Sequence, residues 1–411
     1  MKDFATEAGP GEKTDPGFPS DRGPKPDVLV PNVRVIALLS LGHLIVDTTQ
    51  GGLPAILPFL KTAFGLSYAA VGVLVLVANL TSSVIQPVFG YLADRQSRRW
   101  MLPVSVTLAA CGMSMVGIAR AYWIVLLLLV ITGMGVASFH PEAYRTAGSV
   151  AGARRATAIS WFSVGGNAGT ALGPPVMAAL IAAYGLSGSV GMLLPGILMA
   201  GLFLWILPSM TLPKTNLAAR TMAVHRMQKQ PGAILLLILV VALRSWAHLG
   251  FTTFIPFYYV DYMKADPRGV GVPLFVFLGV GALGTVIGGP LADRWGARRF
   301  MLWGFLAAAP LGVLFLLTRG AIALVFLGLF GGVLVSTFTI SVVLGQSYLP
   351  GNAGLASGLI VGFAIGTGGV AAALLGWLAD HFGLLVVLWI AALTPLACFA
   401  AALFLPAARD S

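Results

Sequence analysis

The sequence GYLADRQSRR occupies residues 90–99, and a close copy of it, GPLADRWGARR, occupies residues 289–299. The copies recur at an offset of 199 residues, measured from Leu92 to Leu291, and each follows a long apolar stretch. A second pair of related segments, VGGNAGT from Val164 and VGFAIGT from Val361, recurs at an offset of 197 residues. Because the two offsets nearly agree, we predict a duplicated chain with two equivalent halves.

The composition is that of a membrane protein. Of the 411 residues, 58% are hydrophobic and 9% are charged, whereas about 25% of the residues in typical soluble proteins are charged. A membrane-spanning helix needs about 20 mostly apolar residues, and twelve continuously apolar, non-alternating stretches recur along the chain, which favours helices over a β-barrel. We predict an all-α membrane protein with twelve transmembrane helices in two six-helix pseudo-symmetric halves. The predicted spans are 33–60, 69–92, 100–119, 122–146, 157–183, 188–208, 232–261, 270–292, 300–318, 321–345, 353–380 and 384–405.

Four regions follow from this pattern. Residues 1–31 are rich in Pro, Gly and charge and contain no apolar core, so we predict a disordered tail and no signal peptide. Residues 32–208 form the N-terminal six-helix half, and residues 232–406 form the C-terminal half. The basic, polar stretch 209–231 is predicted to be a cytoplasmic linker between them.

The net charge of +11 reflects membrane topology rather than nucleic-acid binding. The even-numbered loops hold thirteen basic residues and the odd-numbered loops hold five, so the positive-inside rule places the even-numbered loops and both termini in the cytoplasm. We therefore predict a multi-pass protein of the cell (inner) membrane. The even-loop residues are Arg95, Arg98, Arg99, Arg145, Arg154, Arg155, Lys214, Arg220, Arg226, Lys229, Arg294, Arg298 and Arg299, and the others are Lys61, Arg120, Lys264, Arg268 and Arg319.

Motifs for enzymatic chemistry are missing from the sequence. The two cysteines, Cys111 and Cys398, lie in separate apolar stretches without the spacing of a disulfide framework or metal site. No P-loop, zinc-protease motif or nucleophile elbow occurs. We expect no cofactor, no metal and no enzymatic activity.

The repeated loop resembles the signature G-x-L-x-D-R-x-G-R-R of the major facilitator superfamily, with Ser97 in place of one Gly and Ala297 as an apparent insertion. From about residue 41 to 406, the chain more closely resembles the fosmidomycin-resistance family of that superfamily. This resemblance implies the major facilitator fold and alternating-access transport of a small molecule, and we expect a monomer. Ser347 departs from the family, which tends to have Glu at that place. The segments that carry the resemblance are HLIVDTTQ from His43, QPVFGYLADR from Gln86, FHPEAYR from Phe139, VGGNAGTALGPP from Val164, GTVIGGPLADR from Gly284 and LASGLIVGFAIGTGGVAAALLGWLADH from Leu355.

Ionisable residues inside the predicted spans are candidates for function, because each costs free energy to insert. Asp47 lies in the middle of the first span, with His43 and Gln50 on the same helical face. Arg244 lies near the middle of the seventh span, with His248 one turn later. Equivalent positions in the two halves predict that Asp47 and Arg244 face each other across a central cavity. The alternative is a fixed buried ion pair that holds the halves together.

The segment FHPEAYR lies near the cytoplasmic end of the fourth span, where Pro141 removes a backbone donor. Glu142 and Arg145 are neighbours at i and i+3. In one interpretation, Arg145 extends to the lipid interface and Glu142 only neutralises it. In the other, which the resemblance favours, Glu142 exchanges a proton with the inward-open cavity and His140 tunes it.

The fifth span contains Gly169, Gly173 and Pro174, which resemble the core of the G-x-x-x-G-P motif of antiporters in the superfamily, although Pro175 and Val176 replace its final glycines. Glycines four apart allow close helix packing. The resemblance favours exchange over symport, and Gly169, Gly173 and Pro174 are predicted to take part in gating. Asn167 in the same span is a candidate substrate contact or a packing residue.

The two LADR loops are predicted to be gating elements. A carboxylate that ends a span beside cations can pair with them or with a helix N-terminus and so latch one conformation. A third copy, GWLADHFG from Gly376, lacks the arginine cluster and is expected only to pack. The predicted gating residues in the loops are Asp94, Arg95, Arg98, Arg99, Asp293, Arg294, Arg298 and Arg299.

These features predict a proton-coupled drug antiporter that exports a small anionic or amphipathic compound. Asp47 would carry the proton, together with Glu142, His43 and His140. The substrate would contact Arg244, which attracts its anionic group, and also His248, Gln50, Asn167 and Arg145. Two alternatives stay open: a proton symporter that imports a sugar, metabolite or organic anion, and a membrane sensor that transports nothing.

Overall fold

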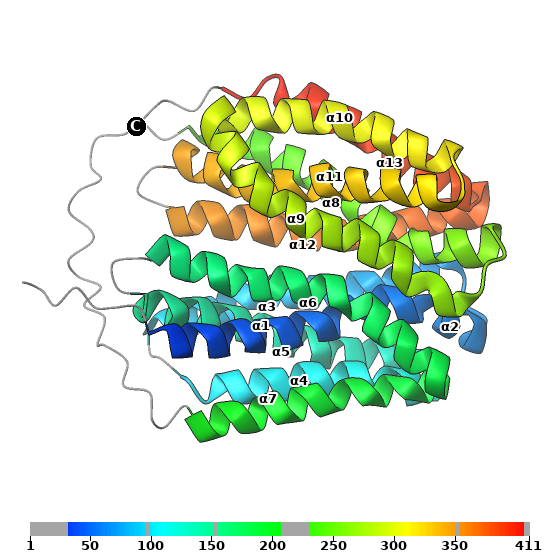
Figure 1. Ribbon diagram of the computed structural model, residues 1–411, viewed down its shortest axis with the longest axis horizontal. Coiled ribbons are helices and arrows are strands. Elements are labelled where there is room, and N and C mark those ends of the chain that lie inside the picture. The colour runs from blue at the N-terminus through cyan, green and yellow to red at the C-terminus, as the bar shows by residue number, and fades with distance from the viewer. Residues whose placement is uncertain (1–31, 96–97, 152–154, 207–229, 350–352, 407–411) are drawn as a thin grey trace, which may run out of the picture.

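The computed structural model describes residues 32–95, 98–151, 155–206, 230–349 and 353–406. The predicted tail 1–31 lies outside this part of the chain, as does nearly all of the predicted linker 209–231. Within it, the chain forms helices, turns and short connections and no strand. The long helices run side by side along one direction, as Figure 1 shows. The prediction of an all-α protein is confirmed.

The helices correspond to the predicted spans, and some spans are divided into two helical segments. The first span is split into two helices at Gly51 and Gly52, where a Cβ at Gly51 would lie 2.8 Å from the carbonyl oxygen of Thr170. The sixth span begins with a short 3-10 helix, and the seventh continues into a π-helical turn. The helices of the first half are α1 (Val33–Gly51), α2 (Leu53–Phe64), α3 (Tyr68–Arg95), α4 (Met101–Met115), η1 (Val116–Ile118), α5 (Tyr122–Ser149), α6 (Arg155–Tyr184), η2 (Leu186–Met192) and α7 (Leu193–Ile206). Those of the second half are α8 (Pro231–Phe257), η5 (Tyr258–Tyr262), η6 (Pro267–Val270), α9 (Gly271–Trp295), α10 (Ala297–Leu317), α11 (Gly320–Tyr348), α12 (Ala353–Phe382) and α13 (Leu384–Ala402).

The duplication is visible in a repeated backbone contact. In the first half, the N–H of Asn32, just before α1, donates to the carbonyl of Val150 at 3.0 Å. In the second half, the N–H of Gln230, just before α8, donates to the carbonyl of Tyr348 at 3.0 Å. Each residue of the first contact has its equivalent 198 residues later in the second contact, Gln230 for Asn32 and Tyr348 for Val150. The two six-helix halves are therefore pseudo-symmetric, as the sequence predicts.

The two halves pack through small residues. Helix α3 of the first half lies against α12 of the second, and α6 lies against α9. A Cβ at Gly72 would collide with the carbonyl of Ala372, and one at Gly376 would collide with the carbonyl of Tyr68. Small residues let helix backbones approach closely. The glycines of α3 and α12 therefore set the distance between the halves.

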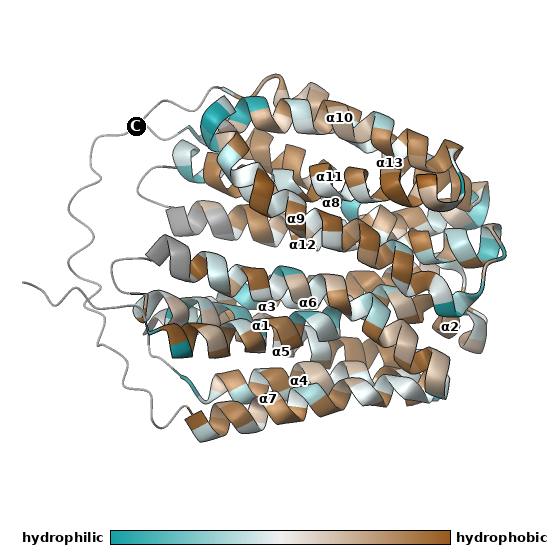
Figure 2. Cartoon of the chain, in the orientation of Figure 1, coloured by the Kyte–Doolittle hydropathy of each residue, from teal (hydrophilic) through white to brown (hydrophobic). Residues whose placement is uncertain are grey.

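The outer surface of the bundle is apolar. Figure 2 shows brown, hydrophobic residues over much of the length of the helices. On α7, Leu198, Leu204 and Trp205 are exposed by 63–78%. An apolar surface of this extent is expected in contact with lipid rather than water. In the described part of the chain, ten helical segments are long and apolar enough to cross a membrane; α1 and α6, which carry several of the polar candidate residues, are not among them.

Candidate functional site

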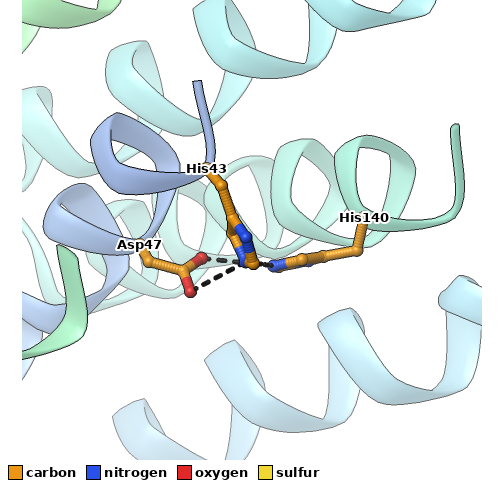
Figure 3. Close-up of side chains that lie close together, drawn as sticks. All are labelled: His43, Asp47 and His140. Atoms are coloured by element: carbon orange, nitrogen blue, oxygen red, sulfur yellow. Dashed lines mark hydrogen bonds and ion pairs between the residues drawn. The ribbon is translucent and has the colours of Figure 1, made fainter. Parts of the chain in front are cut away.

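Two histidines and an aspartate meet inside the first half. His43 and Asp47 come from α1, and His140 comes from α5. The Nε2 atom of His43 lies 3.3 Å from Oδ2 of Asp47, and Nε2 of His140 lies 3.2 Å from Oδ1 of the same carboxylate. The two Nε2 atoms are 3.1 Å apart. Figure 3 shows the three side chains pointing toward one another, and we call them the His–Asp–His cluster.

Local structure orients both imidazoles. Asp47 follows His43 by one helical turn, so the two side chains share a face of α1. Nδ1 of His43 lies 2.9 Å from the carbonyl oxygen of Phe162, and Nδ1 of His140 lies 2.9 Å from that of Val136. A carbonyl oxygen only accepts hydrogen bonds, so each Nδ1 carries a proton and donates it. Both Nε2 atoms are therefore directed at the carboxylate and at each other.

This arrangement can hold a shared proton. With both Nδ1 atoms protonated, two neutral imidazoles would direct two Nε2 lone pairs at each other over 3.1 Å. A hydrogen bond between them exists only if one Nε2 also holds a proton, which makes that ring an imidazolium. The carboxylate of Asp47 then supplies the balancing charge. The His–Asp–His cluster is therefore a place for one exchangeable positive charge in a largely buried environment.

The His–Asp–His cluster lines a cavity of about 210 Å³. Its walls come from α1, α3, α5 and α6 of the first half and from α12 of the second half. Gln50 and Asn167, both expected near the substrate, line this cavity, whereas Arg145, Arg244 and His248 do not. The lining residues are His43, Asp47, Gln50, Ser82, Gln86, Val136, His140, Tyr144, Ser163, Gly166, Asn167, Val361 and Ile365.

Glycines of α6 allow α1 to approach the cavity. A Cβ at Gly165 would collide with the carbonyl of Ser40, and one at Gly169 with the carbonyl of Leu44. A Cβ at Gly173 would lie 2.6 Å from the carbonyl of Thr48. The spacing of four residues puts these glycines on one face of α6. Gly169 and Gly173, which the sequence analysis related to the antiporter motif, thus pack α6 directly against the helix that carries Asp47.

Gly166 offers a test of this packing, because a Cβ there would collide with Nε2 of His43 and lie 2.9 Å from Oδ2 of Asp47. We expect Gly166→Ala to separate the His–Asp–His cluster and to reduce transport by more than about tenfold, because displacements near 1 Å can cost about 100-fold in precisely positioned sites. The matched control is Gly201→Ala on α7, where a Cβ meets nothing within 4 Å. Equal transport rates for the two variants in liposomes would contradict this prediction.

Glu142 and Arg145 form a separate pair. Nη1 of Arg145 lies 3.7 Å from Oε1 of Glu142, whose side chain is fully buried. The predicted i, i+3 contact is present. His140, which the sequence analysis assigned to tuning Glu142, instead contacts Asp47 and His43. The reason is helical direction: His140 and Glu142 are two residues apart and point to different sides of α5.

Arg244 and His248 lie in the second half, away from Asp47. The Nε atom of Arg244 donates to the carbonyl of Leu334 at 3.2 Å, and its guanidinium lies 5.1 Å from the ring centre of Phe338. Arg244 is only 5% exposed, and no carboxylate of the described residues lies within ion-pair distance of it. The expected pairing of Asp47 with Arg244 is therefore not present. Nδ1 of His248 is buried without a hydrogen-bond partner in the described chain.

A buried guanidinium without a carboxylate has a high free energy unless an anion joins it. His248 follows Arg244 by one turn of α8, and its ring packs 5.6 Å from that of Phe277. The two residues thus offer several hydrogen-bond donors on one face of a helix inside the second half. These donors lie in a different half from the His–Asp–His cluster.

The LADR loops are described only in part. The side chains of Asp94 and Arg95 lie outside the described residues. Arg98 and Arg99 precede α4 and are partly buried. In the second copy, Asp293, Arg294 and Arg299 are exposed. Arg298 donates to the carbonyls of Leu405 and Leu403 at 2.5 and 2.7 Å, beyond the C-terminus of α13, where a cation interacts favourably with the helix dipole. This contact of Arg298 stays within its own half.

The sequence analysis missed a network that joins the halves at the end of the bundle where α2 lies. The carboxylate of Asp380, in the third LADH copy, accepts from the N–H groups of Tyr68 and Ala69 at 2.8 Å and so caps α3. The hydroxyl of Tyr68 donates to Asp261 at 2.7 Å, and Nζ of Lys61 lies 3.3 Å from the same carboxylate. The sequence signal for this network was the aspartate of the third motif copy, Asp380. Its role as a helix cap depends on α3 packing beside it, which the sequence does not specify.

We expect Asp380→Asn to favour separation of the halves at the α2 end, because the variant loses the charge that interacts with the N-terminus of α3. Such an interaction is worth about 0.3–1 kcal/mol, which predicts a shift of about two- to fivefold in the conformational equilibrium. Spin labels on α3 and α12 at this end would report the distance distribution. Asp266→Asn, in an exposed turn of the same half, is the control. Identical distributions in both variants would exclude a latch role for Asp380.

A pseudo-symmetric bundle of long apolar helices, with charged and polar side chains lining an internal cavity, is the architecture of a membrane transporter. The sequence profile of the Major Facilitator Superfamily matches residues 39–373 and, in an overlapping second match, residues 265–411. The chain belongs to the Major Facilitator Superfamily and resembles its fosmidomycin-resistance members.

Individual relatives agree with this assignment. The chain is 33% identical over 368 residues to a fosmidomycin resistance protein of Escherichia coli (strain K12), a match that covers 88% of this chain and 90% of the relative. It is 32% identical over 358 residues to an uncharacterized MFS-type transporter, YfnC, of Bacillus subtilis (strain 168), covering 85% and 87%. A D-xylose-proton symporter of known structure shares the fold, with a TM-score of 0.74 and 17% identity over 92% of this chain and 98% of that one.

Proposed function

We propose that the protein is a proton-coupled antiporter that exports a small anionic or amphipathic compound. The observation that carries this proposal is the His–Asp–His cluster, whose two Nε2 atoms and carboxylate oxygens lie 3.1–3.3 Å apart and line a cavity bounded by both halves. In this proposal a proton is held between His43 and His140 and balanced by Asp47. The similarity to a fosmidomycin resistance protein supports export and a fosmidomycin-like substrate.

Coupling follows from how charge is distributed between the halves. The cavity-lining cluster binds the proton, and Arg244 with His248 attracts the anionic group of the substrate. A ligand shifts a conformational equilibrium only by the difference between its affinities for the two states. Exchange therefore requires that proton binding and substrate binding favour opposite movements of the halves. Gln50 and Asn167, which line the cavity, are the proposed polar contacts to the rest of the substrate.

Glu142 is the second proposed proton carrier. It is fully buried and lies near Arg145, two residues beyond His140 on α5. Because Glu142 points to a different side of α5 from His140, it would act as a separate proton site, closer to the end of the bundle where α1 begins. The same proposal places the LADR loops at the cytoplasmic face as gating elements, with a monomer in the inner membrane and both termini in the cytoplasm.

The deciding experiment measures proton and substrate movement together. Purified protein is reconstituted into liposomes with a pH-sensitive dye inside and labelled fosmidomycin on one side, and a pH gradient is imposed. The proposal expects drug and protons to move in opposite directions, with no drug movement in protein-free liposomes. Movement of both in the same direction would identify a symporter. Gradient-independent drug flux would contradict coupling.

A further inference from the structure

The mutual distances in the His–Asp–His cluster match those of a metal site. The two Nε2 atoms lie 3.1 Å apart, and each lies near one oxygen of the Asp47 carboxylate, His43 3.3 Å from Oδ2 and His140 3.2 Å from Oδ1. Zinc binds histidine nitrogens and carboxylate oxygens at about 2.0–2.1 Å in tetrahedral geometry, so neighbouring ligand atoms are about 3.3–3.4 Å apart. An ion placed among these atoms would reach all of them after small side-chain movements.

The surroundings of the imidazoles support the same conclusion. A metal-binding histidine almost always donates its other ring N–H to a carbonyl or carboxylate, which fixes the tautomer and the ring orientation. His43 and His140 both do this, through Phe162 and Val136. Both Nε2 atoms are thus available as ligands. Two aromatic rings further restrain His43, with Phe162 stacked at 4.3 Å and Tyr144 edge-on at 6.1 Å.

We propose that His43, Asp47 and His140 bind a divalent transition-metal ion, with Zn²⁺ as the reference ion. Three protein ligands leave one tetrahedral position open to the cavity, as in zinc sites that accept an exogenous ligand. An oxygen of an anionic, metal-chelating compound is suited to that position. Two imidazoles and one carboxylate favour Zn²⁺, Co²⁺ and Cu²⁺ over Mg²⁺ and Ca²⁺. The inference rests on the cluster geometry and does not depend on the proposed direction or coupling of transport.

Binding is measured on the full-length, tag-free protein in detergent, by calorimetry with Zn²⁺ and by visible absorption with Co²⁺, whose spectrum distinguishes tetrahedral from octahedral coordination. We expect one ion per chain, a tetrahedral Co²⁺ spectrum and no binding of Mg²⁺. His140→Gln is expected to weaken Zn²⁺ binding by more than about 100-fold, because even loss of an outer-shell partner typically weakens it by about 10–100-fold. Equal affinity of the wild type and His140→Gln would overturn the proposal, as would an octahedral Co²⁺ spectrum.

Two further variants separate ligation from folding. His140→Cys replaces one zinc ligand with another, so it is expected to retain tetrahedral Co²⁺ binding with a thiolate absorption band. His381→Gln changes a histidine in the described chain that is exposed and stacked on Trp377 outside the cavity, and it is expected to bind as the wild type does. Loss of binding in His381→Gln would place the ion elsewhere and contradict the assignment. Loss in His140→Cys, with an unchanged melting temperature, would do the same.

Discussion

Liposomes that contain Asp47→Asn are expected to show no uphill transport under a pH gradient. The asparagine side chain keeps the size and hydrogen-bonding reach of aspartate but removes the charge that balances an imidazolium. In the wild type, the carboxylate of Asp47 lies 3.3 Å from Nε2 of His43 and 3.2 Å from Nε2 of His140. In the variant, the proton between these histidines has no counter-ion at such distances. Removing one partner of a buried ion pair typically costs about 3–5 kcal/mol, which corresponds to a more than 100-fold loss of proton affinity. Drug accumulation is expected to fall to the level of empty liposomes.

The same variant should retain exchange that needs no proton. With labelled substrate on one side and unlabelled substrate on the other, at equal pH, counterflow depends on the substrate site and on movement of the halves. We expect Asp47→Asn to support counterflow within about threefold of the wild type, because Asp47 is proposed to balance the bound proton and not to contact the substrate. Asp266→Asn, at an exposed aspartate that precedes η6, is the control for both assays. Persistent uphill transport by Asp47→Asn would remove Asp47 from the coupling mechanism.

Arg244→Met is expected to abolish both uphill transport and counterflow without destabilising the protein. Methionine fills the apolar space beside Phe338 but supplies no donor for an anion. The guanidinium of Arg244 is 5% exposed, and no carboxylate in the described chain pairs with it. Replacing buried charge by apolar side chains is often neutral or stabilising by about 1–4 kcal/mol. The melting temperature should therefore stay constant or rise while transport is lost.

Arg244→Lys refines this prediction. Lysine keeps the positive charge but cannot present the planar, bidentate donors of a guanidinium. We expect weaker substrate binding in this variant, seen as a higher KM with some transport left. A purely structural role for Arg244 predicts the opposite pattern, in which Arg244→Met unfolds at a lower temperature and Arg244→Lys transports normally. Measuring KM and melting temperature on the same preparations separates the two explanations.

The two histidine partners of Asp47 differ in how far they were predictable. His43 precedes Asp47 by four residues, and helical periodicity alone places both on one face of α1. His140 is 97 residues from His43 along the chain, and it reaches the cluster because α5 packs against α1. Its motif, FHPEAYR, singled it out as a candidate, but helical periodicity does not say which residue it meets. The sequence analysis assigned it to Glu142, its neighbour in the chain, and the structure places it beside Asp47.

Local properties of the sequence determined the class of this protein. Apolar stretches of transmembrane length and a repeat near 198 residues depend only on residue type and spacing, and they indicate a duplicated helical membrane protein. The quoted motifs add the resemblance to a transporter family. Tertiary structure decided which charges meet. Asp47 pairs with two histidines of its own half, and Arg244 stays apart in the other half. The approach of α6 to α1 through Gly165, Gly169 and Gly173, and the packing of α5, determine distances of about 3 Å, which no periodicity specifies.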